Sequence, residues 1–152
     1  GAARRGAAVI IAFRNVDAEP SDPVESWPYE ALVTAIERGG VREWARIADA
    51  IERRPWGEVA RRVQTYLGYE RPYGVAPLLE AVVARARHRA EERERATVAS
   101  EVSELQDRSG LGAEGFARAI GTSRSRLSTY RTGTVMPSAA LMVRMRDVAE
   151  LR

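Results

Sequence analysis

The stretch LGAEGFARAIGTSRSRLSTYR, residues 111–131, decides how the C-terminal part of this chain folds. Its first half places Phe116, Ala117 and Ile120 at i, i+1 and i+4, which predicts one apolar face on a short helix. Gly121 follows, and a glycine just past a helix end suits the left-handed conformation that stops the helix. Ala117 is small enough for a second helix to cross closely. We therefore predict two short helices joined by a glycine turn.

The second half of the stretch predicts a capped helix with one apolar face. Ser123 suits the N-cap position, where its hydroxyl accepts a hydrogen bond from a backbone N–H one turn later. Leu127 and Tyr130 are expected to face inward, and Gly133 to end the helix. The residues left for the outer face are Arg124, Ser125, Arg126, Ser128 and Thr129. This pattern is typical of a helix-turn-helix, whose second helix enters the DNA major groove.

Apolar stripes predict one further helix on each side of this motif. The upstream stripe is Val98, Val102 and Leu105. Pro137 and Ser138 restart the chain after the motif. The stripe that follows them is Leu141, Met142, Met145 and Val148.

The charge of the motif favours a nucleic-acid partner. Between Gly115 and Arg146 the chain has no Asp or Glu and holds six arginines: Arg118, Arg124, Arg126, Arg131, Arg144 and Arg146. Arginine can pair bidentately with guanine or clamp a phosphate. All 24 basic residues of the chain are arginines, which is a weaker indication because arginine codons are GC-rich.

Residues 101–149, about a third of the chain, resemble the Cro/C1-type (XRE-like) helix-turn-helix family of bacterial and phage repressors. The residues that match at the family's spacing are Leu111, Phe116, Ala117, Ile120, Gly121, Ser123, Leu127, Ser128, Tyr130, Gly133, Pro137 and Ser138. The resemblance implies a bundle of four or five helices whose third helix, about 124–131, contacts bases. The chain departs from the family at three positions. The family often has Ser or Thr at the position of Gly112, Gln at that of Ala113 and Glu at that of Arg131.

The expected DNA contacts are divided between phosphates and bases. Ser123 and Arg131 are expected at phosphates, although Arg131 is equally compatible with a solvated helix end. Base edges are expected to meet Arg124, Ser125, Arg126 and Thr129, and Ser128 lies on the same face. The alternative for either Arg124 or Arg126 is a phosphate contact.

The first hundred residues predict a separate helical domain. Residues 7–16 are compatible with a strand or with the start of a helix, and residues 17–28 hold three prolines and form a loop. Pro55 is expected in the first turn of a third helix. Four helices are expected, each with its own inward face. The first has Tyr29, Leu32, Val33 and Ile36, and the second has Trp44, Ile47, Ala48 and Ile51. The third has Trp56, Val59, Val63, Tyr66 and Leu67, and the fourth, a long helix from about Val75, has Leu78, Leu79, Val82, Val83 and Ala86. Trp27, Trp44 and Trp56 are expected in the core or as dimer anchors.

Residues 88–97 are polar all round and predict a helical connector that is exposed to solvent or pairs with itself in a dimer. We therefore predict an all-α chain. It has an arm and loop over 1–28, a helical bundle over 29–87 that is a candidate for dimerisation, the connector over 88–97, and the helix-turn-helix domain over 98–152. Residues 44–63 are also vaguely similar to a second helix-turn-helix, but a helical bundle with arginines on its solvent-exposed face is favoured.

Composition narrows the function classes. The chain has no cysteine, and its one histidine, His88, lies in a charged stretch, so we expect no metal site. No apolar run approaches the roughly 18 residues that span a membrane. We find no glycine loop of the kind that binds phosphate and no nucleophile–base set at a spacing that favours catalysis. The sequence therefore gives no indication of an enzyme or of a cofactor.

We therefore expect a sequence-specific transcriptional regulator that binds double-stranded DNA as a homodimer in the bacterial cytoplasm, at the nucleoid. The alternative is an antitoxin-like module whose first domain binds a partner protein.

Overall fold

The computed structural model describes residues 12–13 and 18–151, and these residues form seven α-helices, one short 3₁₀ turn and no strand. The helices are Tyr29–Arg38 (α1), Val41–Arg53 (α2), Glu58–Tyr69 (α3), Val75–Ser109 (α4), Ala113–Ile120 (α5), Arg124–Thr132 (α6) and Ala139–Glu150 (α7), and the 3₁₀ turn is Val24–Ser26 (η3). The all-α prediction is confirmed for these residues, as is the long helix before the motif. The strand or helix start expected over 7–16 lies outside them, apart from Ala12 and Phe13, which belong to neither.

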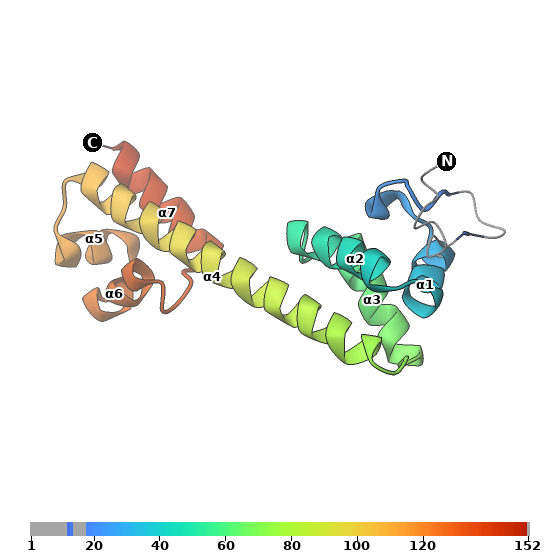
Figure 1. The fold of residues 1–152 in the computed structure, drawn as a ribbon. Coiled ribbons are helices and arrows are strands. Elements are labelled where there is room, and N and C mark those ends of the chain that lie inside the picture. The colour runs from blue at the N-terminus through green and yellow to red at the C-terminus, as the bar shows by residue number, and fades with distance from the viewer. Residues whose placement is uncertain (1–11, 14–17, 152) are drawn as a thin grey trace. The chain divides into compact units, whose positions relative to one another are not determined.

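The described residues form two compact units, divided after His88 (Figure 1). The N-terminal unit contains η3, α1, α2, α3 and the first turns of α4. The C-terminal unit begins at Arg89 and contains the remaining turns of α4 with α5, α6 and α7. Each unit has its own cluster of buried apolar side chains.

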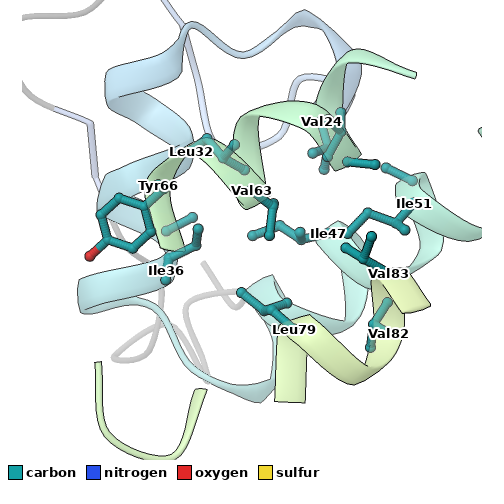
Figure 2. Close-up of a cluster of buried hydrophobic side chains, with 14 of the residues drawn as sticks. Val24, Leu32, Ile36, Ile47, Ile51, Val63, Tyr66, Leu79, Val82 and Val83 are labelled. Atoms are coloured by element: carbon teal, nitrogen blue, oxygen red, sulfur yellow. The ribbon is translucent and has the colours of Figure 1, made fainter. Parts of the chain in front are cut away.

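The core of the N-terminal unit lies between α1, α2, α3 and the first turns of α4. Ile36, Ile47, Val63 and Leu79 are each at most 1% exposed and point into this core (Figure 2). Trp27 closes one side: it is 2% exposed, and its Nε1 donates to the carbonyl of Asp22 at 3.1 Å. The proline-rich loop is thus fixed on the bundle by an aromatic side chain.

Three expectations for the N-terminal unit were wrong. Pro55 does not lie in the first turn of α3, because residues 54–57 form a separate turn closed by a 2.9 Å hydrogen bond from the Gly57 N–H to the Arg54 carbonyl. The turn carries Trp56 outward, where its side chain is 49% exposed. Leu78 is 44% exposed because the inward stripe of α4 passes through Leu79 and the residues three and four positions from it.

The C-terminal unit packs α5, α6 and α7 around the last turns of α4 (Figure 1). The central side chains of its core are Val102, Phe116, Leu127 and Met145, each at most 1% exposed. Before this core begins, residues 91–97 of α4 are all exposed. The polar stretch of the sequence, residues 91–97, is therefore a continuous part of α4 that is exposed to solvent.

Candidate nucleic-acid interface

The turn between α5 and α6 has the geometry that its glycine predicts. Gly121 adopts φ +81°, the left-handed region, and its N–H donates to the Arg118 carbonyl at 3.2 Å. The next N–H, of Thr122, donates to the Ala117 carbonyl at 2.9 Å. Ala117 is 2% exposed, so its small side chain lies within the packed interior.

The first turn of α6 is fixed by a side-chain cap. The Ser123 hydroxyl accepts a hydrogen bond of 3.1 Å from the Arg126 N–H, as the sequence predicted. Leu127 and Tyr130 are 1% and 5% exposed, so they fix which face of α6 points inward. At the other end Gly133 adopts φ +80°, and a Cβ there would lie 3.5 Å from the Arg95 carbonyl oxygen.

The outward face of α6 carries the expected polar residues. The side chains on the exposed surface are Ser123, Arg124, Ser125, Arg126, Ser128 and Arg131. Thr129 is half-buried, and its hydroxyl donates to the Arg126 carbonyl at 2.6 Å, which leaves its oxygen available only as an acceptor.

The six arginines of the acid-free window fall into two groups. Three side chains are held by the protein: Arg131 Nη1 donates to Gln106 Oε1 at 2.5 Å, Arg144 Nη1 to the Ile120 carbonyl at 3.4 Å, and Arg146 Nε to a carboxylate oxygen of Glu101 at 3.1 Å. The other three are Arg118, Arg124 and Arg126, whose side chains make no hydrogen bond or ion pair with any residue that the structure describes. The free arginines on α6 are therefore the two at its N-terminal end.

A buried polar cluster beneath α6 was not anticipated from the sequence. Gln106 is 6% exposed and Ser109 is fully buried. The Ser109 hydroxyl donates to the Gln106 carbonyl at 2.6 Å and accepts from the Leu111 N–H at 3.1 Å. Gln106 Nε2 also reaches the Leu111 carbonyl at 3.4 Å. This cluster joins the end of α4 to the start of α5, and through Arg131 to the end of α6.

A sequence signal for this cluster exists. Gln106 follows Val102 by four residues, and Ser109 follows it by seven, so both lie on the inward arc of α4. A polar residue within an apolar arc indicates a buried hydrogen bond, because an unpaired polar group would be costly there.

Comparisons of the chain with models of protein families, with curated proteins and with solved structures each found no match. Within residues 12–13 and 18–151, no three His, Asp or Glu side chains are grouped so that they could hold a metal ion. None of the helices in this part of the chain combines the length and apolarity needed to cross a membrane.

Proposed function

We propose that this chain is a sequence-specific DNA-binding transcriptional regulator of the Cro/C1-like helix-turn-helix type, with α6 in the major groove. The observation that carries the proposal is the state of Arg124 and Arg126. Both lie in the first turn of a helix that is capped by Ser123 and anchored by Leu127 and Tyr130, and neither guanidinium is engaged by a described residue. A capped helix that is anchored by its buried face and carries unengaged arginines at its N-terminal end fits a major-groove contact.

Five side chains on α6 are available for contacts with bases. Arg124 and Arg126 have all their donors available for guanine O6 and N7, which is the commonest specific contact in the major groove. Ser125 and Ser128 are exposed hydroxyls and can meet bases or backbone. Thr129 can accept from a base donor, since its proton is already used.

Phosphate contacts would fix the helix in register. Ser123 is exposed at the start of α6, and Arg131 is exposed at its end. The hydrogen bond to Gln106 uses one Arg131 nitrogen, so the others can still meet a phosphate oxygen. A homodimer would then require two half-sites about 10 bp apart, or a multiple of one helical turn.

Selection of bound sites from random double-stranded DNA tests this proposal. The expected result is an enriched inverted repeat with G·C pairs at positions that change preference when Arg124 or Arg126 is replaced. The selected site is then titrated at several salt concentrations beside scrambled DNA. Affinities for DNA depend steeply on salt, so the two DNAs must be compared at the same stated concentrations. No enrichment, together with no binding at low salt, would overturn the proposal.

A further inference from the structure

A groove in the N-terminal unit is not used by the proposed DNA contact. It lies between α3 and α4 and has a volume of about 400 Å³. It is lined by Gln64, Leu67, Gly68, Glu80, Val83, Ala84 and Arg87. We infer that a second copy of this chain docks in this groove, so that the N-terminal unit forms the dimer contact. The need for a dimer rests on the proposed function, whereas the groove itself does not.

The middle of the groove is shaped for close approach of another helix. Leu67 and Val83 form the floor of the groove, where they are only 6% and 3% exposed, while Gly68 and Ala84 are small and exposed. A Cβ built on Gly68 would meet no atom within 4 Å, so no side chain of the described residues fills that space. The distance between packed helices depends on the side chains at their contact, and small residues allow the shortest distances.

The charges of the groove favour a second copy of α4 as the occupant, because they are self-complementary. Glu80 and Arg87 both line the groove and are seven residues apart, which is two turns of one helix face. If two copies of α4 pack antiparallel about a two-fold axis between residues 83 and 84, Glu80 of each copy lies opposite Arg87 of the other. Symmetry repeats each contact, so the arrangement forms two Glu–Arg pairs.

The side chain of Arg87 is already ordered by contacts within its own subunit. Its Nε donates to the Pro55 carbonyl at 2.9 Å, and its guanidinium carbon lies 4.5 Å from the centre of the Trp56 ring. The structure gives its terminal nitrogens no other partner among the described residues. Because the side chain is already ordered, binding a carboxylate would cost little further conformational entropy.

Glu80 can take a second arginine. Arg71 donates to both of its carboxylate oxygens, at 2.7 and 2.9 Å, and each oxygen keeps a further acceptor site. Trp56 stands beside Arg87 with 49% of its side chain exposed, and tryptophan and arginine are the residues that most often dominate an interface. Trp56 is therefore the expected anchor at the edge of the contact.

The first test measures the mass of the full chain by sedimentation equilibrium. The wild type is expected to be a dimer. Ala84→Arg fills the groove and is expected to raise the dimer Kd about tenfold or more. The matched control is Ala96→Arg, which adds the same side chain at an exposed alanine of α4 outside the groove and is expected to stay dimeric. A monomeric wild type, or an Ala84→Arg variant as dimeric as the control, overturns the inference.

The second test uses complementary charges. Glu80→Arg and Arg87→Glu each place like charges opposite one another in a homodimer, so each variant alone is expected to dissociate. Mixed in equal amounts they are expected to form a heterodimer, because both opposed pairs are then attractive. Circular dichroism shows whether each variant is folded, and if one is not, the Ala84→Arg comparison still decides. Folded variants that fail to associate when mixed contradict the antiparallel contact.

DNA binding by the same samples separates this inference from the proposed function. A wild-type dimer that Ala84→Arg splits, but that binds no DNA at low salt, would leave the interface standing and overturn the regulator. A wild type that binds DNA while Ala84→Arg remains a full-strength dimer would do the reverse.

Discussion

The side chain of Arg131, at the end of α6, donates a hydrogen bond to the buried carboxamide of Gln106 on α4, with 2.5 Å between Nη1 and Oε1. The bond ties the last turn of the proposed recognition helix to the helix that precedes the motif. It also orders the guanidinium of a residue that is exposed overall. Arg131 is therefore neither a free solvated end nor a wholly available phosphate ligand.

If the ordered Arg131 meets a phosphate, Arg131→Gln should weaken binding to all DNA sequences by a similar factor. The slope of log affinity against log salt should become shallower by about one, because one fewer counterion is released. Titration of the selected site and of scrambled DNA over a salt series measures both quantities. A loss confined to the selected site would instead assign Arg131 to a base.

Arg126→Ala should have the opposite signature. Loss of one bidentate arginine–guanine pair should lower affinity for the selected site by about 1–3 kcal/mol and leave scrambled DNA nearly unaffected. Arg118→Ala is the matched control, since Arg118 is an exposed and equally unengaged arginine of the same motif but lies on α5. Equal losses on both DNAs would make Arg126 a phosphate contact.

Ser109→Ala should destabilise the C-terminal unit although it removes only one oxygen. The fully buried Ser109 hydroxyl accepts from the Leu111 N–H, and because that donor is only partly buried, its loss should cost about 1 kcal/mol, the low end of the range for an unsatisfied buried group. Urea unfolding followed by circular dichroism measures the change in the free energy of unfolding. Ser100→Ala, at an exposed position of the same helix, is the control and should change it little. Similar values for the two variants would show that the buried cluster contributes nothing.

The pair of Glu25 and Arg53 predicts a small dependence of stability on pH. The hydrogen bond from Arg53, 2.9 Å long, holds the pKa of the Glu25 carboxyl below its ordinary value of 4.5. A pKa lowered by folding stabilises the protein above pH 4.5, and this stabilisation is lost as the pH falls through the folded value. The effect should be small and salt-dependent, since both side chains are more than a third exposed.

Glu25→Gln tests this dependence. The variant should be slightly less stable than the wild type at pH 7, and the difference in their free energies of unfolding should shrink below pH 4.5. A difference that stays constant from pH 7 to pH 3 would show that the pair does not set it.

The features that the sequence predicted well are those set by neighbouring residues. The Ser123 cap, the left-handed Gly121, the helix end at Gly133, and the inward Leu127 and Tyr130 each follow from a few consecutive residues. Trp56 was misplaced because its direction depends on a turn closed by Gly57, which shifts the start of α3 beyond the proline.

The bond between Gln106 and Arg131 joins residues 25 positions apart, and no local pattern indicates that pairing. Periodicity can locate Gln106 on the inward arc of α4, but only packing of three helices decides which donor reaches it. The same holds for the groove beside Gly68, whose open space is visible only once α3 and α4 are placed together.

Two substitutions at Ser123 separate its structural task from its proposed contact with DNA. Ser123→Ala removes the cap on α6 and should lower the free energy of unfolding by about 1 kcal/mol. Ser123→Asp keeps an acceptor for the Arg126 N–H and adds a negative charge, which is favourable at a helix N-terminus. The aspartate variant should therefore be at least as stable as the wild type, yet bind DNA more weakly than the alanine variant, because its carboxylate repels phosphate. An aspartate variant that keeps both stability and DNA affinity would place the start of α6 away from the DNA backbone.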